Sequence, residues 1–272
     1  MRKGVAFSRP GHPAVQQRAP VEWVRRQAHP MFFRLTAVFS IALALAGCQP
    51  YSRSVTGFSS TDKKTLYDFR SEKVAAILPA PATAHKLLSA AFPSYASELR
   101  DCKPGQTLAA ILGAAEGSFT AAGVNQTAYL VDAGECGTTP RAATRRMLVF
   151  GGEKLAANVE APIGSAILGV YDLDGDRKHE VLLEDGGAGS GEIIKVARLV
   201  EFDKDKLATV EDFGRIYDNA CAAPGEARSI RASLVYYLPP PPGQKPRFTV
   251  ELYRAPCPAK GQKPEWQRVS GK

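Results

Sequence analysis

The sequence predicts a mainly β fold of antiparallel strands, with α+β character only at its N-terminal side. Three observations lead to this class. From about residue 107 the apolar residues fall in short runs bounded by glycine or acidic turns, as strands do. Near the C-terminus, apolar and polar residues alternate. Helix-like apolar spacing is confined to residues 63–100, where we expect one or two short helices, with Thr83 placed to cap one of them.

The predicted strands become clearest in a C-terminal β-hairpin over residues 228–256. Earlier candidates are the runs 128–131, 146–150, 180–184 and 193–202. In the hairpin, one strand places on a single face Ile230, Ala232, Leu234, Tyr236 and Leu238, and the other places together Phe248, Val250 and Leu252. The proline-rich stretch 239–246 joins the two as a loop, because proline cannot donate to a sheet ladder.

Two related copies are predicted within this β region, at residues 107–160 and 163–214. The tripeptide ILG occurs at 111–113 and at 167–169. The segments AYLVDAGE (128–135) and FGGEKLA (150–156) each precede a similar segment, EVLLEDGG (180–187) and FDKDKLA (202–208), by 52 residues. Short similar segments that recur in the same order indicate a repeated structural unit. We expect each copy to be a small antiparallel unit like a propeller blade, with the first loop four residues longer than the second.

A targeting leader is indicated at residues 1–47. Arg34 precedes an apolar stretch from Leu35 to Ala46, which suits a signal peptide and is too short to span a membrane. It ends in Leu-Ala-Gly-Cys at Cys48, which resembles the bacterial lipobox. That resemblance implies lipidation of Cys48, and Gln49 after it resembles outer-membrane sorting in Gram-negative lipoproteins. An ordinary secretory signal is the alternative. Met31 offers a second start, with a long n-region as the other interpretation.

Charge and cysteine content fit an exported protein that binds no nucleic acid. The net charge is +8, but from residue 49 onward 28 basic residues face 26 acidic ones, so no basic stripe for DNA or RNA is predicted. Beyond Cys48 the chain has four cysteines, an even number that suggests two disulfides. Three connectivities are open, and we favour the local one, which joins Cys102 to Cys136 and Cys221 to Cys257. A zinc site is the rival, but no pair has CxxC spacing.

The stretch YDLDGDRKHE (171–180) predicts a cation site. Its acids occupy alternate positions of a tight loop, and Gly175 eases the turn. Divalent cations such as Ca²⁺ take six to eight oxygen ligands. The predicted ligands are the carboxylates of Asp172, Asp174, Asp176 and Glu180 and the carbonyl of Lys178. The EF-hand form is disfavoured, because Arg177 and Leu183 stand where it needs Gly and Glu. A solvated acidic turn without metal is the alternative.

The loop resembles the FG-GAP or VCBS-type repeat of integrin-α-like β-propellers. The resemblance lies in Asp-x-Asp-Gly-Asp-x-x-x-Glu followed by Val-Leu-Leu, over residues 167–184, and more weakly over 107–214. It implies a structural calcium ion held by positions 1, 3, 5, 7 and 9 of the loop. Arg177 departs from the usual small or polar residue at position 6. Only one loop is intact, whereas such propellers carry several.

These observations predict a non-enzymatic envelope protein. Residues 48–62 form the lipidated cysteine and its tether, and residues 63–272 a single β-rich domain. We expect an outer-membrane anchor, a calcium-stabilised domain and a protein or glycan partner. The alternative is a metal-free, disulfide-held structural or inhibitory lipoprotein. A hydrolase is disfavoured because His85 and His179 stand apart with no metalloprotease motif, and the Gly-rich segment 186–192 lacks P-loop and nucleophile-elbow spacing.

Overall fold

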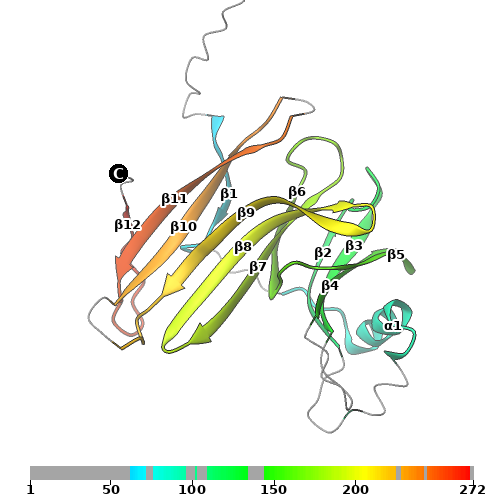
Figure 1. The fold of residues 1–272 in the computed structure, drawn as a ribbon, viewed down its shortest axis with the longest axis horizontal. Coiled ribbons are helices and arrows are strands. Elements are labelled where there is room, and N and C mark those ends of the chain that lie inside the picture. Colours follow the sequence, from blue (N-terminus) through cyan, green and yellow to red (C-terminus); the bar gives the residue numbers. More distant parts are fainter. Residues whose placement is uncertain are drawn as a thin grey trace, which may run out of the picture. The chain divides into compact units, whose positions relative to one another are not determined.

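Two antiparallel sheets make up most of the computed structural model, which confirms the predicted mainly β class (Figure 1). It describes residues 62–71, 76–95, 102, 109–133, 144–224, 228–241 and 244–269, which all lie within one compact unit, Thr56–Lys272. The first sheet is a four-stranded meander in chain order. Its strands are β2 (Ala110–Gly117), β3 (Gln126–Ala133), β4 (Thr144–Gly151) and β5 (Lys154–Glu160).

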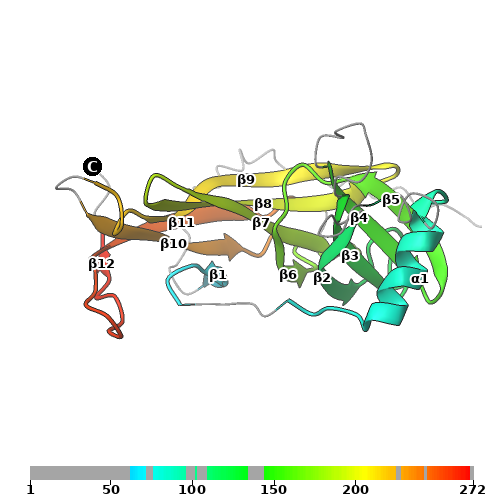
Figure 2. The same cartoon turned by 90° about the horizontal axis from the view of Figure 1, so that it is seen from below.

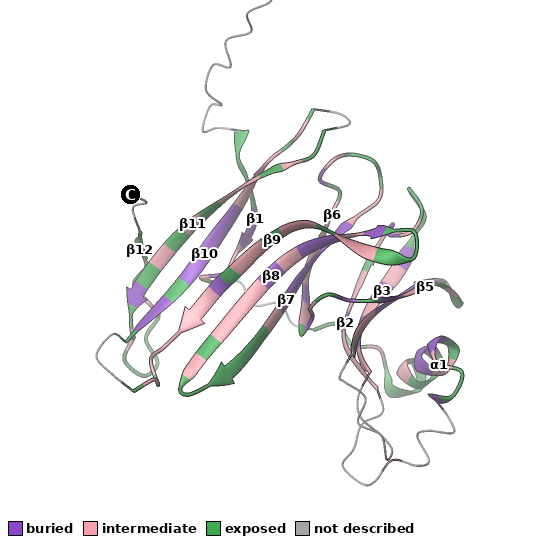
Figure 3. Ribbon diagram, in the orientation of Figure 1, coloured by how far each residue is buried: buried purple, intermediate pink, exposed green. Residues whose placement is uncertain are grey.

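The second sheet is larger and curls along its length (Figures 1 and 2). Its strands also follow chain order: β6 (Ala166–Tyr171), β7 (Glu180–Gly189), β8 (Glu192–Asp203), β9 (Lys206–Asn219), β10 (Ser229–Leu238), β11 (Arg247–Pro256) and β12 (Gln267–Arg268). β10 and β11 pair along their full length, so the predicted hairpin is confirmed. Buried residues follow β10, whereas β11 is mostly exposed or half-buried (Figure 3).

The N-terminal side differs from the prediction in two ways. Residues Lys64–Asp68 form a strand, β1, which pairs with β10, whereas helical spacing was expected from residue 63. The helix α1 (Pro81–Ala91) is present, but its N-cap is Ala80 and Thr83 caps nothing. Proline in the first turn needs no N–H partner, which lets the helix begin there without a side-chain cap. Within the described residues, no helix has the length and apolar character needed to cross a bilayer.

The Gly-rich segment after residue 185 is not the flexible connection that its composition suggests. Residues up to Gly189 continue β7, and Gly189 pairs with Glu192 across a two-residue turn. Ser190 and Gly191 both have positive φ, 50° and 81°, as a type I′ hairpin turn requires. A Cβ on Gly191 would also lie 2.3 Å from the carbonyl oxygen of Ala222, so only glycine fits.

The two predicted copies have the same strand order and share one irregularity, although β4–β5 has one register shift and β8–β9 has three. A bulge interrupts the β2–β3 ladder between Ile111 and Gly113, and the β6–β7 ladder has one between Ile167 and Gly169, so both ILG tripeptides carry it. The β4–β5 and β8–β9 hairpins close in the same register, 150 with 155 and 202 with 207. Their turns both begin with a positive φ, at Gly152 and at Lys204. This correspondence is what the predicted repeat requires.

The two sheets are stacked with their equivalent faces turned in the same direction. Equivalent residues of the two sheets therefore lie in neighbouring hydrophobic cores. Three buried clusters follow one another: α1 against the first sheet, the first sheet against the second, and the second against β1 and the C-terminal segment. Leu148 and Phe150 face α1, and their equivalents Val200 and Phe202 face the first sheet. Likewise Leu130 faces the second sheet, and its equivalent Leu182 faces β1. Each unit therefore repeats the packing of its neighbour, as in repeat proteins.

A disulfide joins Cys221, after β9, to Cys257, after β11, as predicted, with an S–S distance of 2.02 Å. Cys102 is also disulfide-bonded. Cys136 and Cys48 lie outside the described residues. The chain-entropy estimate for a closed loop of this size is about 3–4 kcal/mol of stabilisation.

Leu183→Ala tests whether the two sheets fold as one unit. Leu183 is fully buried in the core between the sheets, so the truncation should lower the free energy of unfolding by about 2–5 kcal/mol. Thermal melts followed by circular dichroism should show one transition at a lower temperature. The matched control is Leu252→Ala, since Leu252 is 39% exposed and should cost about 0.5 kcal/mol or less. Two separated transitions in either protein would show that the sheets unfold independently.

Candidate metal site

The acidic loop connects β6 to β7, and its own aspartates shape it. The Oδ1 of Asp172 accepts the N–H of Gly175 at 3.0 Å, and the Oδ1 of Asp174 accepts the N–H of Asp176 at 3.1 Å. The Oδ1 of Asp176 then accepts the N–H of Lys178 at 2.6 Å. These are successive turns in which a side chain binds the backbone two or three residues ahead. Each of these bonds uses Oδ1, and the Oδ2 of Asp176 lies 3.6 Å from the ammonium group of Lys178.

Three of the predicted ligands gather at one point. A carboxylate oxygen from each of Asp172, Asp174 and Asp176 lies within 4.8 Å of the others. Oxygens on one Ca²⁺ lie 2.3–2.6 Å from it, so any two are at most about 5.2 Å apart. The three side chains therefore fit a calcium ion in spacing and in chemistry. Asp172 and Asp176 are exposed and Asp174 is half-buried, so the cluster opens to solvent.

Glu180 stands apart from these three in its surroundings. It is the first residue of β7 and is 4% exposed. Its Oε2 accepts the N–H of Leu173 at 3.0 Å, which ties the start of the loop to its end. Burial raises the pKa of Glu180 to about 7, and the negative charge of Asp174 adds to the rise, although the Leu173 N–H opposes it. Glu180 and the Lys178 carbonyl remain predicted ligands.

The equivalent loop of the first sheet, residues 118–125, has the same length of eight residues. The expectation of a longer first loop is wrong, because the four extra residues lengthen β2 and β3 by two pairs. In both loops, the same type of hydrogen bond joins the end of the loop to its start. The Oε1 of Gln126 accepts the N–H of Phe119 seven residues earlier, as Glu180 does with Leu173.

The two loops therefore differ in charge rather than in shape. The backbone of Gly123 has φ 70°, and that of Arg177, at the same loop position, has φ 69°. The positions of the three aspartates are held in the first loop by uncharged residues: Ser118, Thr120 and Ala122. Opposite Thr120, the Nε2 of Gln126 donates to the hydroxyl at 2.7 Å. Where the first loop has a hydrogen bond, the second has two carboxylates, Asp174 and Glu180.

The two loops also contact each other, a feature that sequence reasoning missed. The N–H of His179 donates to the carbonyl of Ser118 at 2.7 Å, and the N–H of Ser118 donates back to His179 Nδ1 at 3.0 Å. The N–H of Gly123 donates to the carbonyl of Arg177 at 3.0 Å. The guanidinium of Arg177 lies against Gly123, where a Cβ would come within 2.5 Å of it. The unusual position-6 arginine thus reaches towards the first sheet.

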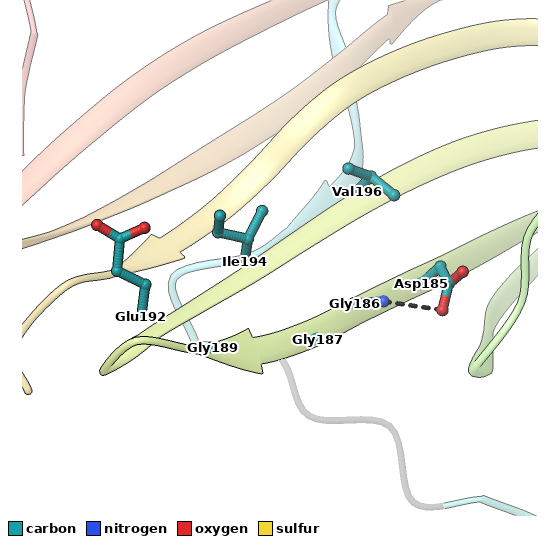
Figure 4. A pocket seen from close by; sticks show the side chains of 7 residues that line it. All are labelled: Asp185, Gly186, Gly187, Gly189, Glu192, Ile194 and Val196. Atoms are coloured by element: carbon teal, nitrogen blue, oxygen red, sulfur yellow. Dashed lines mark hydrogen bonds between the residues drawn. The ribbon is translucent and has the colours of Figure 1, made fainter. Parts of the chain in front are cut away.

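Acidic residues of the second sheet outside this loop are engaged in ion pairs. Glu184 binds Lys195 at 2.7 Å, and Asp212 binds Arg198 at 2.6 Å, so these acids serve as ion-pair partners. A shallow hollow lies beside the glycines of β7, where Ile194 and Val196 are the apolar side chains (Figure 4). Asp185 there accepts the N–H of Gly186 at 2.9 Å. This hollow brings together no set of convergent catalytic groups.

Comparisons with protein-family models, with curated proteins and with solved structures found no significant match. The resemblance of the acidic loop to the FG-GAP repeat therefore rests on the residues of the loop, and it stays a prediction.

Gln126→Met tests the hydrogen bond that joins the end of the first loop to its start. Methionine keeps the length of the side chain but removes its polar atoms, so the N–H groups of Phe119 and Thr120 lose their shared acceptor. We expect the free energy of unfolding to fall by about 1–3 kcal/mol, the cost of unsatisfied buried donors. Urea unfolding measures it. Gln244→Met, at an exposed position, is the control, and equal stability of the two variants would contradict this role.

Proposed function

We propose that this chain is a non-enzymatic, outer-membrane-anchored lipoprotein whose β domain is stabilised by one calcium ion and binds an envelope protein or a glycan. The observation that carries the calcium assignment is the pairing of equivalent loops. The first loop closes with neutral hydrogen bonds, whereas the second sets three clustered aspartates beside a buried glutamate.

A cation accounts for this difference in physical terms. Like charges at short range repel one another, and burial adds a desolvation penalty for Glu180. The first loop shows that the same conformation forms without acids, so the acids are not needed for the turn itself. A divalent ion turns the repulsion into attraction. Calcium fits better than magnesium, since it accepts more oxygens in a less regular shell.

The ion has a structural task in this proposal. The loop that holds it also binds the first sheet through His179 and Arg177. An ion between the aspartates would stiffen that loop and, with it, the contact between the sheets. Its affinity belongs to the extracellular range, roughly 0.1–1 mM, where occupancy follows the surroundings of the cell. That range suits stabilisation outside the cytoplasm.

The anchor assignment is supported by the sequence alone. The apolar stretch 35–46 and the Leu-Ala-Gly-Cys ending at Cys48 lie outside the described residues. The disulfide between Cys221 and Cys257 fits an oxidising compartment. The alternative function, a metal-free, disulfide-held structural or inhibitory lipoprotein, shares the anchor and differs in the loop.

Calcium should raise the melting temperature of the oxidised protein. At ten times the dissociation constant, binding adds about 1.4 kcal/mol, or roughly 3–6 °C for a domain of this size. Differential scanning calorimetry with EDTA and then with millimolar Ca²⁺ measures the shift. Asp174→Asn should abolish it, because one clustered carboxylate is lost.

The matched control for that experiment is Asp205→Asn, an exposed acid in the β8–β9 turn. It should keep the full shift. Identical curves with EDTA and calcium for the unmodified protein would reject the metal site and favour the metal-free alternative.

Replacement of Cys48 or Gln49 tests the anchor. Expressed in a Gram-negative host, the full chain should carry fatty acids that mass spectrometry finds on Cys48, and it should sediment with the outer membrane. Cys48→Ser should lose both properties. Gln49→Asp should keep the lipid but move the protein to the inner membrane. A soluble, unlipidated wild-type protein would contradict the proposal.

A further inference from the structure

A cleft of about 370 Å³ lies on the second sheet, on the face that is turned away from the first sheet. Its lining includes three aromatic side chains, Phe69, Tyr217 and Trp266, and three charged ones, Arg70, Glu184 and Lys195. They come from four places: the end of β1, β7 with β8, β9, and the segment before β12. The volume is at the lower end of the range for small-molecule sites, so it suits one or two small rings.

The charges in the cleft are paired within the protein. Lys195 Nζ lies 2.7 Å from Glu184 Oε1, and the Glu184 side chain is 11% exposed. Arg70 binds Asp68 through Nε and Nη2 at 2.9 and 2.8 Å. The guanidinium also lies 4.0 Å from the ring of Tyr253. A charged ligand would have to compete with these pairs, so the cleft favours a neutral one.

The Glu184–Lys195 pair can still make hydrogen bonds to a neutral ligand. An ammonium group has three donors and a carboxylate has two oxygens, and their mutual bond uses one of each. A donor and an acceptor are thus set side by side, which is what two adjacent hydroxyl groups require. Bonds from charged groups to hydroxyls are stronger than those between neutral groups.

The aromatic rings supply the second half of this chemistry. Trp266 and Tyr217 are half-buried and pack against the core of the second sheet, so each shows part of its surface to solvent. A sugar ring has an apolar face of C–H groups and a rim of hydroxyls. The C–H face can stack on an aromatic ring while the hydroxyl groups form hydrogen bonds with the Glu184–Lys195 ion pair. Apolar walls with a few placed polar groups are typical of small-ligand sites.

The wall that carries Trp266 is fixed at both ends. The disulfide to Cys221 holds Cys257 at the start of the segment. At its end, Gln267 and Arg268 pair with β11, and Arg268 binds Glu251 at 2.8 Å. A wall held in place loses little freedom when a ligand binds, which favours affinity.

We infer that this cleft binds a neutral sugar residue of a glycan, with Trp266 as the stacking surface and the Glu184–Lys195 pair as the hydroxyl-binding group. The inference rests on the proposed function, since it narrows the partner to a glycan and names the surface that meets it.

Fluorescence of Trp266 tests the inference directly. The chain has two tryptophans, so Trp23→Phe in the full-length protein leaves Trp266 as the reporter. The probes are three neutral trisaccharides, built of α-linked glucose, β-linked glucose and N-acetylglucosamine. At least one should give a saturable change in emission that is the same at 50 and 500 mM NaCl, because a neutral ligand is not screened. No change with any of them would overturn the inference.

Two variants distinguish binding from folding. Lys195→Met should weaken binding at least tenfold, the loss expected for a charged hydrogen bond. The single variant leaves the carboxylate of Glu184 without its ion-pair partner, which could itself lower stability. The double variant Glu184→Gln with Lys195→Met removes both charges together. It should bind the sugar as weakly as the single variant and keep the melting temperature of the unmodified protein. Lys206→Met, at an exposed lysine outside the cleft, should bind normally.

Two further outcomes separate this inference from the calcium proposal. Tighter, salt-sensitive binding of a uronic acid trisaccharide would contradict the neutral-ligand assignment. If the protein binds a sugar but calcium leaves its melting temperature unchanged, the sugar-binding inference is supported and the calcium site is rejected. A calcium-dependent melting temperature without a fluorescence response to any sugar would support the calcium site and overturn the sugar-binding inference.

Discussion

The apolar contact between the two sheets is the interaction on which the rest of the structure depends. Leu130 and Met147 from the first sheet meet Val181 and Leu183 from the second, and all four are fully buried. Because the sheets stack in the same sense, each also has an opposite face that is apolar and must be covered. A single four-stranded sheet with two apolar faces cannot be stable in water. The stack therefore needs a partner for every face, and α1 and β1 provide the two outermost ones.

The same stacking places the two equivalent loops beside each other. Loops at corresponding ends of successive sheets must meet, and the bonds of Ser118 with His179 show that they do. The first loop is closed by Gln126, whose amide can both accept and donate. Glu180 in the second loop can only accept when it is ionised, so in that state the carboxylates of Asp174 and Glu180 have no donor between them. This single difference in hydrogen-bonding capacity is the physical basis of the calcium proposal.

Local patterns in the sequence were sufficient for the mainly β class and the C-terminal hairpin, but not for pairings between distant segments. The FGGEKLA and FDKDKLA segments identified equivalent turns because a hairpin is a local structure. Residues Lys64–Asp68 were misread because their partner, Leu234–Tyr237 in β10, lies far along the chain. In the site, the clustering of the aspartates followed from their alternate spacing. The burial of Glu180 and the contact of Arg177 with Gly123 did not, since both depend on the first sheet and on how far each ladder extends.

The two ends of the stack are covered in different ways, and this difference bears on where a ligand can bind. At the first end, α1 lays Leu87, Leu88 and Ala91 onto β3 and β4 and closes the face. At the second end, the sheet curls and the cover consists of β1 and a short C-terminal segment, so part of the face stays open at Glu184 and Lys195. A polar pair within a sheet face is costly unless its members bind each other or a ligand. At this end of the stack, part of the face of the second sheet is not covered by another element. Its side chains are therefore available to bind a ligand.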